Sequence, residues 1–329
     1  MSDPIMTRIQ HSHTLLVAQL SKKPTSKTTN APVPSTILKS TPAEALAVFT
    51  DPSITHVLLD CDGVVYCNKF PLYKTNEMIT HLQSIGKKVF FVTNSSSKSR
   101  QAMAHKVQTL MNLPDITADQ MVPSCYAAAT YVKSVLPPNK KCYVIGGKGV
   151  ADELNLLGIE CVGGPYSEGD AVGMSEEDIE GLVLDKDVGC VVVGMASDFT
   201  YKMLQEACLY LQQDPGCLLV STNQDEYGSR RTAVNCGKPS TVLFDLLQRE
   251  HGVTAANAIM VGDRVDTDIK FGHDHGMRSA LVLSGCSTPE KVMEVLVGGE
   301  DVEGGVTPSV VLPYLGYGMD DTIQPSSAM

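Results

Sequence analysis

The chain has 329 residues, a net charge of -11, a pI of about 5.2 and 43% apolar residues. This length predicts one large domain with an insertion, or two domains, and the apolar fraction is enough for a buried core. The acidic balance argues against nucleic acid as a partner, because proteins that bind it usually present a basic face. No apolar run reaches the roughly 18 residues that a membrane-spanning helix needs, so no membrane partner is expected.

The two ends of the chain differ in composition from the rest. Residues 1–50 hold two acidic and five basic residues, and Ser, Thr and Pro are frequent between 21 and 42. This composition favours a disordered tail. The alternative is a transit peptide within residues 1–45, which would direct the chain to a plastid or another organelle. Residues 319–329 are expected to form a loose C-terminal tail.

The ten cysteines form no CxxC pair, and several lie inside apolar runs. Cysteine in such runs packs as a small hydrophobic residue, and unpaired cysteines are typical of a reducing compartment. A cytoplasmic protein is therefore expected.

Between the tails, strand and helix patterns alternate. Apolar runs predict strands at 56–60, 88–93, 141–145, 190–194, 217–221, 257–262 and 279–283. Helices are predicted at 74–85, 98–112, 125–136, 148–157, 200–213, 239–250, 267–275 and 289–296. This alternation predicts an α/β fold with a doubly wound, mainly parallel (Rossmann-like) sheet. Ligands of such sheets bind beyond the carboxyl ends of the strands, and Asp60, Thr93 and Asp263 each stand where a predicted strand ends.

Asp60 and Asp62 are two residues apart at the end of the first predicted strand, so their side chains point to one face. Adjacent carboxylates repel unless a cation lies between them or one is protonated, and Mg²⁺ prefers oxygen ligands. Gly63 permits a tight turn that brings N–H groups near an anion. The alternative is a strand that ends in a turn with two solvated acids.

Thr93, Asn94 and Ser95 stand between a strand and a predicted helix. The free N–H groups at the start of a helix bind anions, so these residues suit a phosphate site. A plain serine cap with a polar loop is the alternative, and the two interpretations are compatible.

Lys238 follows a glycine just before a predicted helix, where its ammonium group could neutralise a phosphate, although most lysines are simply solvated. Asp263 ends a buried strand and is a candidate metal ligand. Asp268, in the acid-rich turn that follows, either holds the Lys238 ammonium in place or interacts with the helix dipole.

Taken together and in this order, the four segments resemble the four motifs of the haloacid dehalogenase superfamily. The closer similarity is to the eukaryotic 4-nitrophenylphosphatase, phosphoglycolate phosphatase and pyridoxal phosphate phosphatase group. The similar strings are LDCDGVV at 59–65, FVTNSSSKSR at 91–100, GKPS at 237–240 and VGDRVDTDI at 261–269. The resemblance implies a hydrolase core at 51–118 and 232–318 with an inserted α/β cap domain at 119–231, a segment too long for a loop.

The resemblance also implies a mechanism. Asp60 would attack phosphorus and form an aspartyl-phosphate, while Asp62 would protonate the leaving alcohol and then activate water. Mg²⁺ would be held by the Asp60 side chain, the Asp62 main-chain carbonyl and Asp263. Residues implied in substrate binding are Thr93, Asn94, Ser95 and Lys238, with Gly63 and Asp268 in support.

The expected partner is a small phosphorylated metabolite, with a homodimer through the cap as a further expectation. The string Ser96–Arg100 looks more like the phosphoglycolate branch, so 2-phosphoglycolate is the expected substrate. The alternatives are pyridoxal phosphate, a sugar phosphate or 4-nitrophenyl phosphate.

The segment between Asn223 and Lys238 is shorter than in relatives by on the order of twenty residues, roughly one helix and a turn. This departure motivates a rival hypothesis, a phosphometabolite-binding protein without catalysis. Phosphoryl transfer to another acceptor, as in a mutase, is a third.

Overall fold

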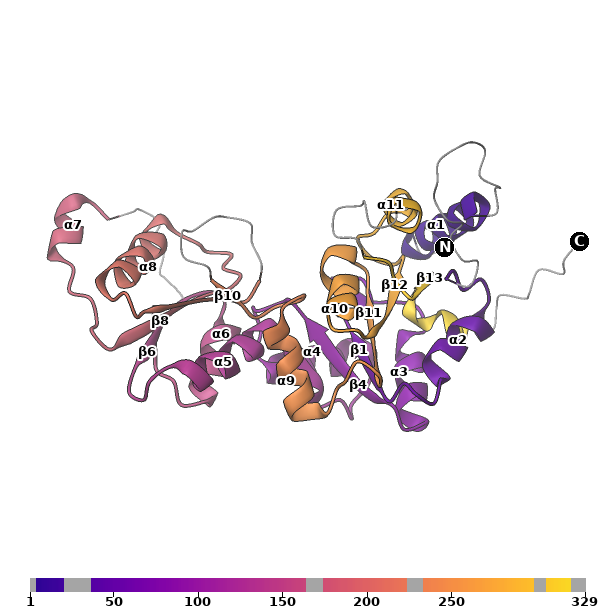
Figure 1. Cartoon of the computed structure of the whole chain (residues 1–329), viewed down its shortest axis with the longest axis horizontal. Coiled ribbons are helices and arrows are strands. Elements are labelled where there is room, and N and C mark those ends of the chain that lie inside the picture. Colours follow the sequence, from indigo (N-terminus) through magenta and orange to yellow (C-terminus); the bar gives the residue numbers. More distant parts are fainter. Residues whose placement is uncertain (1–3, 21–36, 164–173, 224–232, 299–305, 321–329) are drawn as a thin grey trace, which may run out of the picture. The chain divides into compact units, whose positions relative to one another are not determined.

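The computed structural model of this chain describes residues 4–20, 37–163, 174–223, 233–298 and 306–320 (Figure 1). Contacts between residues divide the chain into two compact units. The first comprises Met1–Val92, Lys106–Ile116 and His251–Met329, and the second comprises Thr93–His105 and Thr117–Glu250. The predicted boundaries of a hydrolase core and a cap domain stay a prediction beside this division.

A six-stranded sheet has the order β13-β12-β11-β1-β4-β5. Its strands are β1 (His56–Leu59), β4 (Lys88–Thr93), β5 (Met121–Pro123), β11 (Ala258–Gly262), β12 (Arg278–Val282) and β13 (Val310–Leu312). β1 pairs in parallel with β4 on one side and β11 on the other, so that Leu59 lies opposite both Phe91 and Val261. Every residue of β1 and β11 is buried, as expected for central strands of a parallel sheet with continuous apolar runs.

The second unit contains a five-stranded sheet of order β10-β9-β8-β6-β7, and its strands also pair in parallel. They are β6 (Lys141–Ile145), β7 (Cys161–Gly163), β8 (Val188–Val193), β9 (Leu218–Ser221) and β10 (Val234–Asn235). Outside these two sheets, in the first unit, β2 (Tyr66–Cys67) and β3 (Phe70–Pro71) form a short antiparallel hairpin with two residues in each strand. The predicted α/β class with mainly parallel sheets is therefore confirmed.

Each predicted helix has a counterpart in the structure. They are α3 (Thr75–Ser84), α4 (Arg100–Met111), α5 (Ser124–Val135), α6 (Lys148–Leu156), α8 (Tyr201–Gln213), α9 (Thr241–His251), α10 (Lys270–Asp274) and α11 (Pro289–Gly298). α7 (Glu176–Gly181) and the short helical turns at Ala118–Gln120 and Leu315–Met319 were not predicted. The helix predicted at 267–275 begins instead with a π-helical turn, Val265–Ile269, which runs into α10.

The N-terminal region differs from the expected disordered tail. Pro4–Leu20 form helix α1 and Pro42–Thr50 form helix α2, and both bury apolar side chains, among them Ile9, Leu16 and Phe49. α2 starts with a capping box between Thr41 and Glu44, and Leu16 packs against Val292 and Leu296 of α11. Overall composition concealed these buried positions, while most of the Ser, Thr and Pro-rich stretch, at 21–36, lies outside the described residues.

At the other end, Met319 closes the last helical turn and Asp320 is buried, so these two residues are folded and not part of the loose C-terminal tail predicted from 319. The rest of that tail, from 321 on, lies outside the described residues. No helix in the described part of the chain is both long enough and apolar enough to cross a bilayer.

Candidate active site

Three aspartates meet at the carboxyl ends of β1 and β11. Asp60 follows β1 directly, Asp263 follows β11, and Asp268 lies in the π-helical turn after it. Each offers a carboxylate oxygen, and these oxygens all lie within 4.8 Å of one another. Among the described residues this is the only such group of His, Cys, Asp or Glu side chains. The strand-end rule, by which ligands bind beyond the carboxyl ends of parallel strands, thus placed Asp60 and Asp263 correctly at one edge of the sheet.

The burial of these three carboxylates, together called the carboxylate group below, costs free energy unless a cation is bound. Asp263 is 2% exposed and Asp268 is 1% exposed, while Asp60 is half-buried. Two unit charges at this separation repel by about 3 kcal/mol at an effective dielectric constant of ~20. A hard divalent cation with oxygen ligands would replace this repulsion with attraction. The donor set therefore fits a divalent metal ion.

Three glycines leave room for these carboxylates. A Cβ atom at Gly285 would lie 1.9 Å from Asp263 Oδ2, and one at Gly63 would lie 2.6 Å from the same oxygen. A Cβ atom at Gly262 would lie 2.0 Å from the Asp268 Cβ. Gly63 also has a φ of +83°, which other residues rarely adopt. The main chain therefore approaches the carboxylates more closely than any side chain would permit.

Asp263 is fixed by the loop that follows β12. The Cys286 N–H donates to Asp263 Oδ2 at 2.6 Å, and the Ser287 hydroxyl donates to the Asp263 carbonyl at 2.5 Å. The Ser284 hydroxyl donates to the Gly63 carbonyl at 2.5 Å, which joins this loop to the turn after β1. From α1, the Arg8 guanidinium donates to the Ser284 carbonyl at 3.2 Å.

Sequence reasoning missed residues 284–287, although they too follow the carboxyl end of a predicted strand. The same strand-end rule applied to 279–283 would have found them.

Within the acid-rich turn, only Asp268 joins the carboxylate group. The Arg264 N–H donates to its Oδ2 at 3.1 Å. Asp266 turns away and pairs with the Arg264 guanidinium at 2.5 Å, and this hydrogen bond lowers the pKa of Asp266. The two acids therefore have different surroundings although they are two residues apart.

Asp62 and Gly63 form the turn after β1. Gly63 N–H donates to the Tyr66 carbonyl at 2.8 Å, and Asp62 bridges to Tyr66. The Asp62 side chain is exposed and is not a member of the carboxylate group. Its roles as proton donor and as main-chain metal ligand stay predictions.

In the second unit, the loop after β4 is tied to Lys238. The Thr93 hydroxyl, buried, accepts a hydrogen bond from the Ser95 N–H at 3.1 Å. The Asn94 side chain accepts from the Lys238 N–H at 2.7 Å and donates to the Lys238 carbonyl at 3.1 Å. Lys238 is thus held at both its main-chain N–H and its main-chain carbonyl. Most of the short segment before it, 224–232, lies outside the described residues.

The predicted site residues therefore fall into two groups. The first unit holds Asp60, Asp62, Gly63, Asp263 and Asp268, and the second holds Thr93, Asn94, Ser95 and Lys238. Their union in one phosphate site stays a prediction.

The string Ser96–Arg100 makes internal contacts in the second unit. Ser96 is fully buried, and its hydroxyl accepts from the Met195 N–H at 3.0 Å. The main-chain N–H and the Nε of Arg100 donate to the fully buried Glu153 at 2.6 and 3.2 Å. The Arg100 guanidinium also stacks 3.6 Å from the Tyr126 ring. Burial and a hydrogen bond to Glu250 raise the pKa of Tyr126 to about 12.

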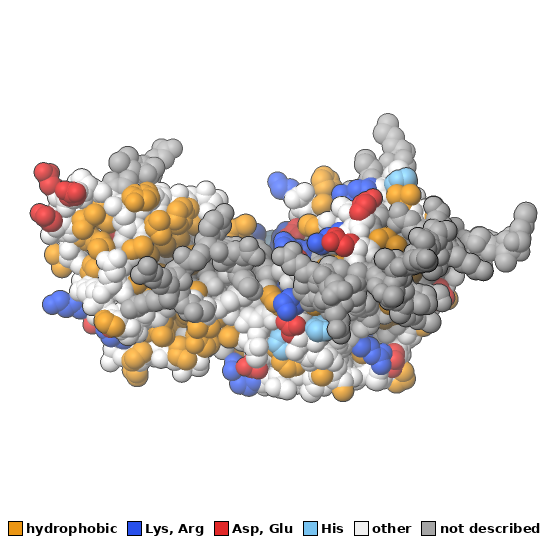
Figure 2. All heavy atoms as spheres, turned by 45° about the horizontal axis from the view of Figure 1, so that its top comes forward, with side chains coloured by type: hydrophobic (Ala, Val, Ile, Leu, Met, Phe, Trp, Pro, Cys, Tyr) orange, Lys and Arg blue, Asp and Glu red, His pale blue; other side chains and the backbone are white. Residues whose placement is uncertain are grey.

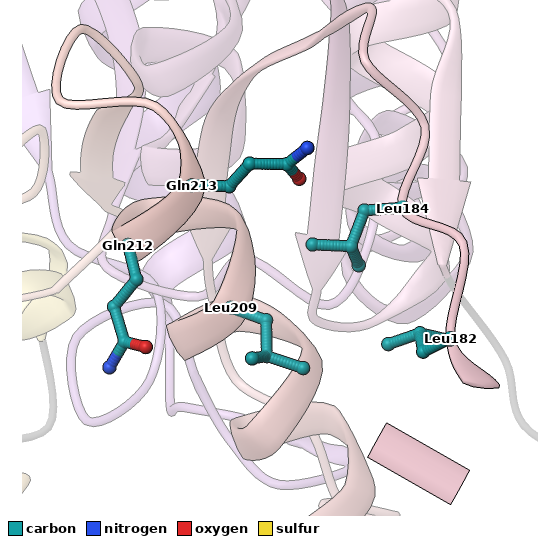
Figure 3. A pocket seen from close by; sticks show the side chains of 5 residues that line it. All are labelled: Leu182, Leu184, Leu209, Gln212 and Gln213. Carbon is teal, nitrogen blue, oxygen red and sulfur yellow. The ribbon is translucent and has the colours of Figure 1, made fainter. Parts of the chain in front are cut away.

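A hollow of about 380 Å³ lies between α8 and the segment after α7 (Figure 3). Its lining residues are Leu182, Leu184, Leu209, Gln212 and Gln213, and none of them is a predicted site residue. Figure 2 shows hydrophobic side chains gathered over this unit, at the left of the view.

Comparison with known proteins identifies the family. Models of haloacid dehalogenase-like hydrolases match residues 57–160 and 235–309. Phosphoglycolate phosphatase 2 of Arabidopsis thaliana is 36% identical over 265 residues, which cover 74% of this chain and 87% of that protein. Human glycerol-3-phosphate phosphatase is also 36% identical, over 70% of this chain and 79% of that protein.

A glycerol phosphate phosphatase of Mycobacterium tuberculosis, solved in complex with magnesium, has the same fold. Its TM-score is 0.62 at 21% identity, and the match covers 81% of this chain and 76% of that one.

The chain therefore belongs to the haloacid dehalogenase-like hydrolases, as the four segments had indicated. Its relatives place it among the phosphatases of that family, which confirms the prediction of a phosphomonoester hydrolase.

Proposed function

We propose that this protein hydrolyses a small phosphorylated metabolite with the help of Mg²⁺. The observation that carries the proposal is the buried carboxylate group of Asp60, Asp263 and Asp268, which suits a hard divalent cation. When bound there, Mg²⁺ would offset the negative charge of the carboxylates and of the phosphate. Asp60, Asp263 and the main-chain carbonyl of Asp62 would hold it.

The proposed reaction has two halves. Asp60 attacks phosphorus, a carboxylate oxygen–phosphorus bond forms, and the ester bond breaks as Asp62 gives a proton to the leaving alcohol. In the second half Asp62 takes a proton from water, the water oxygen attacks phosphorus, and inorganic phosphate leaves Asp60 free again. Thr93, Ser95 and Lys238 bind the phosphate oxygens in this scheme, whereas the side chain of Asn94, also predicted to bind phosphate, makes its two hydrogen bonds to the main chain of Lys238. The exposed side chain of Asp62 supports its role, because an acid–base group must reach both the alcohol and water.

The proposed substrate is 2-phosphoglycolate, supported by the similarity to the Arabidopsis phosphoglycolate phosphatase. The human relative is named for glycerol 3-phosphate at equal identity, so that ester belongs in the test with pyridoxal phosphate, a sugar phosphate and 4-nitrophenyl phosphate. Phosphate release from each would be measured with Mg²⁺ and with chelator. Phosphoglycolate should give the highest kcat/KM, and lack of its turnover would refute this choice of substrate.

The mechanism is tested by Asp60→Asn, which keeps the size of the side chain and removes the nucleophile. Turnover should fall to background while the circular dichroism spectrum stays that of the wild type. A variant as active as the wild type would contradict the scheme. If the wild-type protein released an isomeric ester without free phosphate, it would be a mutase. If it bound the ligand and released no phosphate, it would be a binding protein.

A second copy of the chain is the proposed protein partner, through the second unit. Several large apolar side chains of that unit are exposed, namely Val183, Met195, Phe199, Tyr201 and Leu204. Light scattering after size exclusion would test the dimer, and replacement of Phe199 and Tyr201 by Ser should yield monomers. A monomeric wild type would refute it.

The proposed compartment is the cytoplasm. Ile9 and Leu16 are fully buried in the first unit, which favours a folded element over a removable transit peptide. A fluorescent fusion at the C-terminus would report the compartment, and accumulation in an organelle would refute the proposal.

A further inference from the structure

The side-chain amide of Asn94 makes two hydrogen bonds to a single residue that is 144 positions away in the chain. Its Oδ1 accepts from the Lys238 N–H at 2.7 Å, and its Nδ2 donates to the Lys238 carbonyl at 3.1 Å. The donor end and the acceptor end of the amide are therefore both directed to the main chain of Lys238. This pairing sets the orientation of the amide plane.

A second asparagine holds the residue before Lys238. The Gly237 N–H donates to Asn235 Oδ1 at 3.0 Å. Gly237 itself is tightly enclosed, because a Cβ atom there would lie 2.3 Å from the Thr222 carbonyl oxygen and 2.9 Å from Asn94 Oδ1. The main chain at Lys238 is therefore held by Asn94, and at the preceding residue by Asn235. Lys238 itself is only 2% exposed.

We propose that Asn94 is a positioning residue, which orients Lys238 rather than binding phosphate itself. The ammonium group of lysine is a point charge at the end of a four-carbon side chain. Because Lys238 is only 2% exposed, a shift of its main chain would also move its enclosed side chain. The amide of Asn94 supplies that support from the loop after β4, so that Thr93, Ser95 and Lys238 keep fixed places in one unit. This inference rests on the proposed function, because only that function gives Lys238 the role of binding the phosphate of the substrate.

A double-mutant cycle separates the two roles of Asn94. Asn94→Ala should lower kcat/KM on the order of tenfold to a hundredfold, since small displacements of a charged group have effects of this size. In a Lys238→Met background the same change should have less than about a twofold effect, because nothing is left to position. Losses that multiply in the double variant would show that Asn94 binds phosphate independently and would overturn the proposal.

A measurement without turnover covers the case in which a Lys238 variant does not fold. An amine-reactive reagent labels lysines at rates that follow their exposure and order, and mass spectrometry of the Lys238 peptide gives its rate. Asn94→Ala should raise this rate several-fold over that of the wild type. Equal rates would overturn the proposal even if no substrate were found. Absence of phosphate release by the wild type would refute only the proposed function.

Asn257→Ala is the matched control. The side-chain amide of Asn257 also accepts one main-chain hydrogen bond and donates another, but to two nearby residues. Its Oδ1 accepts from the Thr254 N–H at 2.8 Å and its Nδ2 donates to the Gly252 carbonyl at 3.0 Å. It is half-buried like Asn94 but precedes β11, at the opposite end of the strand from Asp263. The control should leave kcat/KM and the labelling rate of Lys238 within about twofold of the wild type. An equal loss of activity in both variants would mean a general effect on stability and would overturn the proposal.

Discussion

The main-chain N–H of Asp60 donates to the carbonyl of Val261 at 2.9 Å. This bond extends the pairing of β1 and β11 by one residue and brings Asp60 level with the end of β11, where Asp263 follows. The meeting of the two carboxylates is therefore a consequence of sheet register. A one-residue slip of β1 would turn Asp60 to the other face of the sheet.

Asp263→Asn should make the protein more stable in the absence of metal and less stable than the wild type in the presence of Mg²⁺. Removing one of three mutually repelling charges should raise the free energy of unfolding without metal by about 1–3 kcal/mol. The rise in Tm on addition of Mg²⁺, which follows from binding to the folded state, should be lost. Differential scanning fluorimetry with Mg²⁺ or chelator measures both effects.

Asp266→Asn is the control for this experiment, because Asp266 lies outside the carboxylate group and pairs with Arg264. It should retain the Mg²⁺-dependent rise in Tm. If Asp263→Asn retained that rise as well, Asp263 would not be a metal ligand.

Gly285→Ala should destabilise the protein and weaken metal binding together. The added methyl group would lie 1.9 Å from Asp263 Oδ2, so either the loop or the carboxylate must move. Forced insertions of this kind typically cost about 1–3 kcal/mol. Urea unfolding and Mg²⁺ titration of the purified variant check the two effects.

Gly181→Ala in α7 is the matched change, since a Cβ there would meet nothing within 4 Å apart from its chain neighbours and the backbone of its own helix. It should be neutral or stabilise by up to about 1 kcal/mol, because alanine loses less entropy in a helix. A wild-type Mg²⁺ affinity in Gly285→Ala would contradict the expected crowding of Asp263.

His56 should make stability fall as the solution becomes acidic. Its Nε2 donates to the His251 carbonyl at 3.0 Å, and its Nδ1 then accepts from the Thr55 hydroxyl at 2.8 Å, which requires the neutral ring. Burial lowers the pKa of His56 below its ordinary value of 6.5. Between these two pKa values the unfolded chain binds more protons than the folded one, so stability rises with pH across this window.

Urea unfolding of wild type and His56→Gln as a function of pH measures this contribution. The variant should lose part of the decrease in stability that begins below pH 6.5, the ordinary pKa of the ring. Parallel curves for the two proteins would show that His56 does not couple protonation to folding.

Leu16→Ala tests whether α1 is part of the folded unit. Leu16 is fully buried and packs with Val292 and Leu296, so its truncation should lower the free energy of unfolding by about 2–4 kcal/mol. Thr14→Ala, on the exposed side of the same helix, should change it by less than about 0.5 kcal/mol. Equal stability of both variants would mean that α1 contributes nothing to the fold.

The main strands and helices were predictable because their signals are local. Runs such as 56–60 and 257–262 are apolar throughout, and central parallel strands require such runs. The short strands β5, β7 and β13 escaped prediction, since three residues are too few to show a period. The helices α1 and α2 were missed because the composition of 1–50 as a whole outweighed a few buried positions.

The sequence by itself determined that Asp60 and Asp263 stand at strand ends, and that these ends meet on one edge of a parallel sheet. Only the tertiary structure decided which other groups join them. A π-helical turn directs Asp268 inward and Asp266 outward. Arg100 forms an ion pair with the buried Glu153. Asn94, predicted as a phosphate ligand, is directed to the main chain of Lys238. Strand-end positions follow from local periodicity, whereas these pairings depend on partners brought close by folding.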